Sequence, residues 1–151
     1  MEIPKIYKDS DTNISLIQSR KVGIVGFGNQ GRAQALNLKD SGIDVRIGIR
    51  KGSASRKLAE SVGLNCCVIS EMLEYCDIIT LLVPDQDMGE VYRTHIESNL
   101  WKGQTLLFAH GYNIHYNVIQ PPEFINVLMA APSGAGSELR KQYKAGKGIP
   151  G

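Results

Sequence analysis

Short apolar runs alternate with amphipathic stretches along most of this chain. The apolar runs are rich in β-branched and aliphatic side chains, as is typical of strands buried on both faces of a sheet. We expect strands at residues 21–25, 45–49, 64–68, 78–83, 105–108 and 126–130. Apolar positions in the intervening stretches recur at helical spacing, which predicts helices at 30–38, 53–62, 70–75 and 87–98, the third opened by a capping Ser70.

This regular alternation, with short connections, predicts a parallel sheet with helices on both faces. The expected fold class is therefore α/β, a single domain with a doubly wound, mostly parallel sheet. We expect an N-terminal arm at 1–20 with a short amphipathic helix near 12–18, the sheet domain at 21–132, and a basic, Gly-rich C-terminal tail at 133–151 without a further strand.

The composition, with 42% hydrophobic and 21% charged residues in 151, fits one globular domain. The longest apolar run, 78–83, is far shorter than the ~20 residues that span a bilayer, and charges near the N-terminus interrupt any signal-peptide core. We therefore expect a cytoplasmic protein without membrane contact. Cys66, Cys67 and Cys76 lack zinc or disulfide spacing and are expected to be buried in a reducing compartment, the first two on opposite faces of a strand.

Positive charge collects in two places, although the formal net charge is only +2. The tail carries several cations, but no set of aromatic side chains accompanies them, and we expect no nucleic-acid partner. The second cluster has five cations and no acid between residues 46 and 57. The ligand that this cluster could bind depends on the strand that precedes it.

Gly26, Gly28 and Gly31 have the spacing G-x-G-x-x-G, between the first expected strand and the first long helix. In this context Gly26 permits a tight turn, Gly28 lets the backbone approach a pyrophosphate, and Gly31 lets the helix pack closely on the sheet. The free N–H groups at the start of the helix would then face the anion. The pattern predicts a Rossmann-type dinucleotide site; the alternative is a turn that has lost this role.

The end of the second expected strand indicates which dinucleotide is bound. An NAD site usually has an acidic residue there that accepts hydrogen bonds from the ribose 2′-hydroxyl. This chain instead has Arg50, followed by Ser53 and Ser55. A guanidinium and two hydroxyls can hold a 2′-phosphate, which favours NADP; the alternative is a solvated basic loop.

Taken together, these motifs resemble the N-terminal domain of ketol-acid reductoisomerase. The likeness extends along nearly the whole chain, from the arm at 7–11 to the segment at 146–150. It is carried by the stretches 26–31, 33–38, 40–45, 50–55, 82–85, 107–114 and 131–132.

The resemblance implies a role in branched-chain amino-acid biosynthesis, in which a magnesium-dependent alkyl shift precedes reduction by NADPH. It implies a catalytic role for His110, whose alternative is a strand-end histidine bonded to a neighbouring loop. The implied cofactor-binding residues are Gly26, Phe27, Gly28, Asn29, Gln30, Gly31, Arg50, Ser53, Ser55, Asp85, Gln86 and Gly111.

Two departures from the family pattern shape the expected function. Ser133 stands where the family has a lysine after Ala-Pro. The family's helical domain, which supplies acidic magnesium ligands, has no counterpart in these 151 residues, and we expect no metal site and no isomeroreductase activity from this chain alone.

Two functions stay open. One is an NADP-dependent oxidoreductase acting on a small 2-keto acid, with its site completed by a second subunit of a homo-oligomer, by a partner chain that supplies a catalytic domain, or by a missing C-terminal half. The other is a non-catalytic NADP(H)-binding or regulatory paralogue. The loss of the lysine favours the second, and the retained loop around His110 favours the first.

Overall fold

A computed structural model describes residues 8–151, and residues 1–7 of the expected arm lie outside that range. Within it, six strands form one parallel sheet: β1 (Lys21–Val25), β2 (Asp44–Ile49), β3 (Asn65–Val68), β4 (Ile78–Leu81), β5 (Thr105–Phe108) and β6 (Asn126–Met129). Each expected strand is confirmed to within a residue or two at its ends. The predicted α/β fold with a parallel sheet is therefore confirmed.

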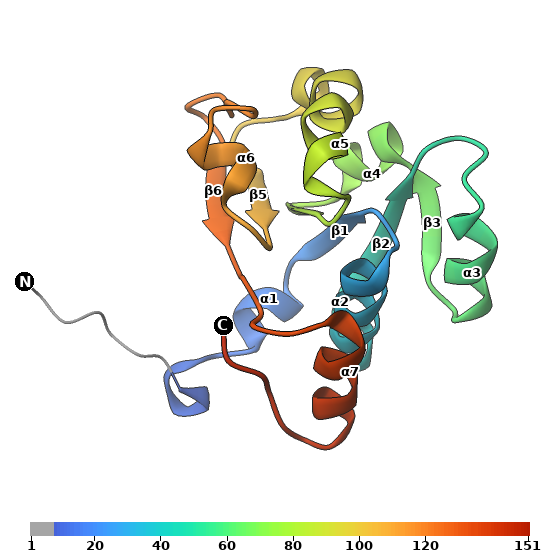
Figure 1. The fold of residues 1–151 in the computed structure, drawn as a ribbon, viewed down its shortest axis with the longest axis vertical. Coiled ribbons are helices and arrows are strands. Elements are labelled where there is room, and N and C mark those ends of the chain that lie inside the picture. The colour runs from blue at the N-terminus through green and yellow to red at the C-terminus, as the bar shows by residue number, and fades with distance from the viewer. Residues whose placement is uncertain (1–7) are drawn as a thin grey trace, which may run out of the picture.

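The strand order is β3-β2-β1-β4-β5-β6, so the chain returns to the middle of the sheet after β3 and continues outward on the other side of β1 (Figure 1). The carboxyl ends of β1 and β4 lie side by side, because Val25 pairs with Leu81. Loops that leave these two strands depart in opposite directions, which opens a crevice between them.

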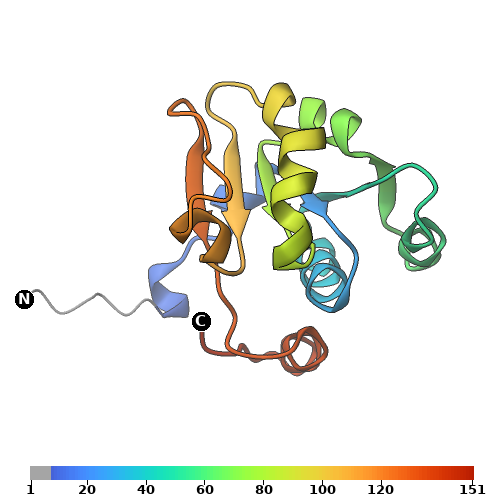
Figure 2. The same ribbon diagram turned by 45° about the horizontal axis from the view of Figure 1, so that its top comes forward.

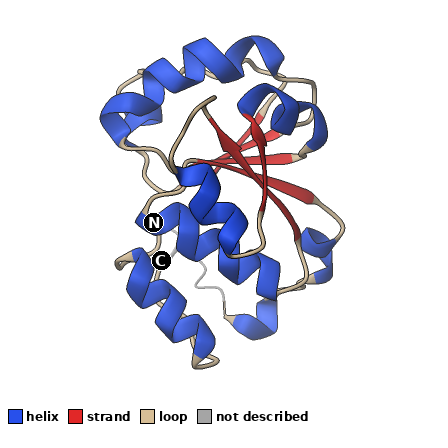
Figure 3. Cartoon of the chain, turned by 90° about the vertical axis from the view of Figure 1, so that its right-hand side faces the viewer, coloured by secondary structure: helices blue, strands red, loops and turns tan. Residues whose placement is uncertain are grey.

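The helices form two layers around the twisted sheet (Figure 3). The bounds of the α-helices are α1 (Ser15–Gln18), α2 (Asn29–Asp40), α3 (Ser55–Ser61), α4 (Ile69–Tyr75), α5 (Asp85–Val91), α6 (Tyr112–His115) and α7 (Gly136–Lys144). The shorter turns are η1 (Asp9–Asp11), the π-helical η2 (Tyr92–Ile96) and η3 (Glu97–Asn99). One core cluster joins α4, α5 and η2 to the sheet, and a second joins α2 and α3 to the opposite face. No helix within residues 8–151 has the length and apolar character needed to cross a membrane.

The expected helical cover is incomplete on one face of the sheet. Leu128 of β6 is 56% exposed. With its pairing partner Leu107 of β5 it lines an apolar groove of about 760 Å³ on the side of α2. The physical reason is the connectivity: the long connections from β4 to β5 and from β5 to β6 cross the opposite face, where they carry α5 and α6.

Two helix starts differ from expectation. The helix expected at 70–75 begins at Ile69, which is buried and already helical, so Ser70 lies inside the first turn and does not cap it. The helix expected at 87–98 begins at Asp85, directly after Pro84, and continues as a π-helical turn and a 3₁₀ turn instead of one α-helix. Because α5 begins earlier, both Asp85 and Asp87 lie in its first turn.

The C-terminal stretch 133–151 carries α7, which packs along α2 (Figure 2). Arg140 donates hydrogen bonds to Asp40 Oδ2 (2.6 Å) and Asn37 Oδ1 (2.8 Å). The hydroxyls of Tyr143 and Ser41 lie 2.7 Å apart. These polar contacts fix α7 to the helix that begins at the glycine loop.

All three cysteines are free thiols. Cys66 packs with the cluster under α2 and α3, and Cys67 with the cluster under α4, so they face opposite sides of β3 as expected. Cys76 is fully buried, and this burial raises the pKa of its thiol to about 12.

Candidate functional site

Two connected clefts lie at the carboxyl edge of the sheet. The first, of about 220 Å³, runs from the glycine loop to the loop after β2. The second, of about 250 Å³, runs from the end of β4 to the loop after β5. Leu82, Val83 and Pro84 line both clefts, so the two meet over the end of β4. This is the place where an α/β sheet of this strand order binds its ligands.

The glycine loop is tightly packed at its first and last glycines. Gly26 has φ +100°, a region that side chains disfavour, and a Cβ there would lie 2.8 Å from the backbone oxygen of Leu82. A Cβ on Gly31 would collide with the backbone oxygen of Gly26. Both glycines therefore let α2 begin directly against the turn after β1.

Gly28 is different, because a Cβ built on it would meet nothing within 4 Å. It lines the first cleft and immediately precedes α2, whose first-turn N–H groups have no partners inside the helix. Packing within the fold therefore does not require glycine at this position, and its absent side chain leaves open space beside the start of α2. An anionic group such as a pyrophosphate fits this cradle of open backbone and helix N-terminus.

Arg50, Ser53 and Ser55 all line the far end of the first cleft. A tight turn brings them together: Ser53 N–H donates to Arg50 O (3.1 Å), and Gly52 between them has φ +80°. Ser53 Oγ in turn accepts a hydrogen bond from Ser55 N–H (3.3 Å). Arg50 and the two serines thus line the same space.

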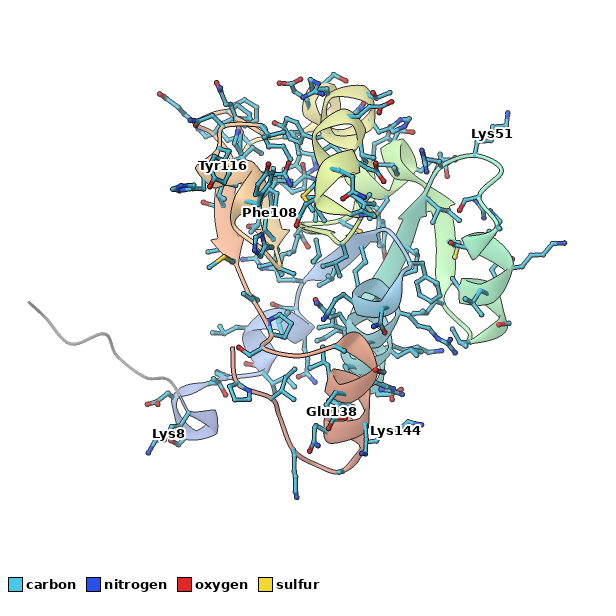
Figure 4. All side chains as sticks on the ribbon, viewed as in Figure 1. Lys8, Lys51, Phe108, Tyr116, Glu138 and Lys144 are labelled. Carbon is cyan, nitrogen blue, oxygen red and sulfur yellow. The ribbon has the colours of Figure 1, made fainter. Side chains whose placement is uncertain are left out.

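The neighbouring cations are used differently. The Arg46 guanidinium stacks on the ring of Tyr75, 3.1 Å from its centroid. Arg56 pairs with Glu60 and donates to a backbone oxygen of β3. Lys51 extends away from the body of the molecule (Figure 4). Of these cations only Arg50 lines the cleft, where an incoming anion could meet it.

The second cleft holds the other group of expected residues. His110 and Ala109 line it from the loop after β5, and Asp85 lines it from the first turn of α5. His110 Nδ1 lies 3.7 Å from Asp85 Oδ2, and both side chains are solvent-accessible. Gly111 follows as the residue that precedes α6.

Other expected cofactor residues are placed less directly. Phe27 lines the first cleft but is only 7% exposed, because its ring belongs to the core under α2. Gln30 reaches the second cleft, where its side-chain amide donates to Gly134 O (2.8 Å). Asn29 lines a groove toward α7 instead, and neither Gln86 nor Gly111 is among the lining residues of the two clefts.

Asp87 lines the first cleft with Arg50 and the two serines, although the sequence pattern did not mark it as a site residue. It also lines an adjoining hollow of about 140 Å³ with Arg50, Glu90 and His95. Pro84 was the available signal, because proline often stands at the start of a helix. A helix that starts just after Pro84 places Asp87 in its first turn.

A metal site does not fit the described residues. Within residues 8–151 no group of three or more His, Cys, Asp or Glu side chains is placed to hold a metal ion.

Ser133, which stands at the position of the family's lysine, lies next to the second cleft. Its backbone N–H donates to Pro150 O (2.7 Å), and its neighbour Pro132 lines that cleft.

The chain is similar to known proteins in both sequence and structure. A family model described as acetohydroxy acid isomeroreductase, NADPH-binding domain, matches residues 16–151. The ketol-acid reductoisomerase (NADP(+)) of Kocuria rhizophila is 47% identical over 146 residues, covering 97% of this chain and 43% of that protein. The structure of an NADH-preferring ketol-acid reductoisomerase from an uncultured archaean has a TM-score of 0.93 and 36% identity, covering 97% of this chain and 46% of that one.

A more distant likeness concerns the fold alone. A semialdehyde dehydrogenase NAD-binding protein from Cupriavidus necator has a TM-score of 0.67 and 22% identity, covering 76% of this chain and 41% of that one. This chain spans less than half the length of each of these three proteins.

Proposed function

Because the chain belongs to the acetohydroxy acid isomeroreductase family and corresponds to the NADPH-binding domain of that family, we propose that NADP(H) lies across the two connected clefts. The open space over Gly28 carries the proposal, because it is room that the fold leaves beside a helix N-terminus. The pyrophosphate would lie there, between the two ends of the site.

At one end of the dinucleotide, Arg50, Ser53 and Ser55 hold the 2′-phosphate. The guanidinium offers charge-assisted hydrogen bonds, and the two hydroxyls can each donate one. Their position in the first cleft supports this role, since Arg46 and Arg56 are engaged elsewhere. The chain therefore prefers NADP(H) to NAD(H).

At the other end, the second cleft takes the nicotinamide and the carbonyl that is reduced. Bound NADPH supplies the hydride for such a reduction. His110 offers the carbonyl oxygen a hydrogen bond from the loop after β5, and Asp85 faces it across the cleft. A donor at this oxygen stabilises the negative charge that develops as the hydride arrives.

The substrate of this reduction is a small 2-keto acid of branched-chain amino-acid biosynthesis, in keeping with the family. Ligands for magnesium and the remaining substrate contacts come from outside the described residues, from a further domain or from a partner subunit.

The proposal is tested by calorimetric titration of NADP⁺ and NAD⁺ into the wild type and Arg50→Glu. A charge-assisted hydrogen bond contributes about 1.5–3 kcal/mol, so the substitution is expected to weaken NADP⁺ binding by tenfold or more. Binding of NAD⁺ should change much less.

Lys51→Glu is the matched control, because it makes the same change of charge one residue away on a side chain that points outward. It should leave the preference nearly intact. Equal affinities for the two dinucleotides, or the same loss in both variants, would contradict the assignment of Arg50.

A further inference from the structure

The imidazole of His110 accepts a hydrogen bond from the backbone. Tyr112 N–H, at the first position of α6, donates to His110 Nδ1 (3.2 Å). A ring nitrogen that accepts a hydrogen bond carries no proton, so the proton of the neutral ring is on Nε2. The geometry of one backbone amide therefore selects one of the two tautomers.

Asp85 favours the opposite tautomer. Its Oδ2 lies 3.7 Å from the same nitrogen, close enough after a small movement to accept a hydrogen bond from a protonated Nδ1. The Tyr112 amide occupies Nδ1 in the structure, so Asp85 stays beyond hydrogen-bond distance. The two groups thus compete for one atom of His110.

Asn113 holds Asp85 in position relative to His110. Its side chain is fully buried, and its amide donates to Asp85 O (3.2 Å) and approaches Asp85 Oδ1 (3.4 Å). The contact ties the first residue of α5 to α6, and so fixes the loop that carries Asp85 relative to the loop that carries His110. Its own Oδ1 is buried without a partner in the described part of the chain, and its amide also approaches Met88 Sδ (3.4 Å) in the core under α5.

We propose that the Tyr112 amide and the Asn113 side chain are positioning groups that keep His110 in the Nε2–H tautomer, so that it presents a donor to the second cleft. The ligand recognised by this donor is an oxygen acceptor such as the carbonyl of a 2-keto acid. The meaning of the donor rests on the proposed function, but the tautomer itself can be measured without cofactor or substrate.

The test is nitrogen NMR of the chain with ¹⁵N-labelled histidine, at a pH where the ring is neutral. The resonances of His110 are identified by their loss in His110→Gln. The wild type should show a protonated Nε2 and an unprotonated Nδ1. A majority of the Nδ1–H form in the wild type would overturn the proposal.

The decisive variant is Tyr112→Pro, which deletes the amide proton. Proline is favoured at the first position of a helix. The preceding Gly111 is in the αR region, which disfavours a following proline, but it has no Cβ to add to the clash with the ring. The Nδ1–H form should increase, because Asp85 then becomes its acceptor. The matched control Tyr112→Ala removes the same side chain but keeps the N–H, and it should retain the wild-type tautomer.

A second pair of variants covers the case in which Tyr112→Pro alters the loop. Adding Asp85→Ala to Tyr112→Pro should abolish the increase in the Nδ1–H form. Asn113→Ala should increase the Nδ1–H form relative to the wild type, since it frees Asp85 to approach the ring. Identical tautomer ratios in Tyr112→Pro and Tyr112→Ala would overturn the proposal.

Binding of adenosine 2′,5′-bisphosphate separates this inference from the proposed function. This probe reaches the Arg50 end of the site and not His110. Unchanged affinity in Tyr112→Pro shows that the variant is folded, so a null tautomer result then counts against the inference alone. Failure of the wild type to bind the probe would count against the proposed function and leave the tautomer result standing.

Discussion

Gly31 in the first turn of α2 lies directly against the backbone oxygen of Gly26, so that a Cβ on Gly31 would collide with it. Gly31→Ala should therefore destabilise the chain although alanine is the better helix former. Overpacking typically costs about 1–3 kcal/mol, which exceeds the gain of up to about 1 kcal/mol in helix propensity. Urea denaturation measures the difference in the free energy of unfolding between Gly31→Ala and the wild type. A variant as stable as the wild type would show that Gly31 and Gly26 are not in tight contact.

Gly28→Val should affect binding instead of folding. The space around a Cβ at Gly28 is empty in the protein, and the proposed pyrophosphate position fills it. We expect a loss of stability of about 1 kcal/mol, since valine suits the start of a helix poorly, together with loss of detectable NADP⁺ binding. Gly148→Val is the control, because Gly148 also has open space but lies outside the cleft. Normal NADP⁺ affinity in a folded Gly28→Val chain would remove the pyrophosphate from this loop.

Asp87→Asn should strengthen NADP⁺ binding. Asp87 lines the same cleft as Arg50, so its carboxylate repels a 2′-phosphate held there. Removing one like charge from the lining of this cleft is expected to contribute about 1 kcal/mol, or roughly fivefold in affinity. NAD⁺, which lacks the phosphate, serves as the internal control and should bind nearly as before. A similar gain for both dinucleotides would indicate a general effect on the helix.

The glycine loop could be predicted from sequence because its signals are contiguous. Gly26, Gly28 and Gly31 follow a strand and open a helix within a few residues, so local geometry fixes their surroundings. The apolar strands were equally clear. Their register and order then bring Arg50 and His110 to one edge of the sheet, as the fold class requires.

Contacts between distant segments could not be predicted in this way. Arg140 meets Asp40 across 100 residues, and neither residue carries a local signal of the other. Asp87 was missed because the cleft-facing side of α5 depends on where that helix begins. The exposure of Leu128 on the side of α2 depends on which face of the sheet each connection crosses, which apolar periodicity does not encode.

Stability should fall at alkaline pH because of Cys76. Burial raises its folded pKa to about 12, above the value of 9.0 of an exposed thiol. The unfolded chain therefore releases this proton first as the pH rises, and the stabilisation that is complete below pH 9 is lost toward pH 12. One such group contributes at most about 1.4 kcal/mol per pH unit. Urea unfolding between pH 8 and pH 11 should show a shallower decline in Cys76→Ala than in the wild type, and an equal slope would contradict this.

Arg140→Ala should loosen α7 from α2. The side chain of Arg140 is only 20% exposed and donates to both Asp40 and Asn37. Its removal leaves Asp40 Oδ2 and Asn37 Oδ1 without this donor, so that water must replace it. Because Asp40 is 45% exposed, solvent screens the pair, and we expect a loss of about 1 kcal/mol. Lys141→Ala is the matched control. Lys141 is the next residue of α7 and is 77% exposed, and its Nζ lies as far as 4.0 Å from Glu138 Oε2. Hydrogen exchange should locate the loosening, with faster exchange of α7 amides in Arg140→Ala and unchanged exchange in Lys141→Ala. Equal protection of α7 in both variants would show that Arg140 does not fix this helix.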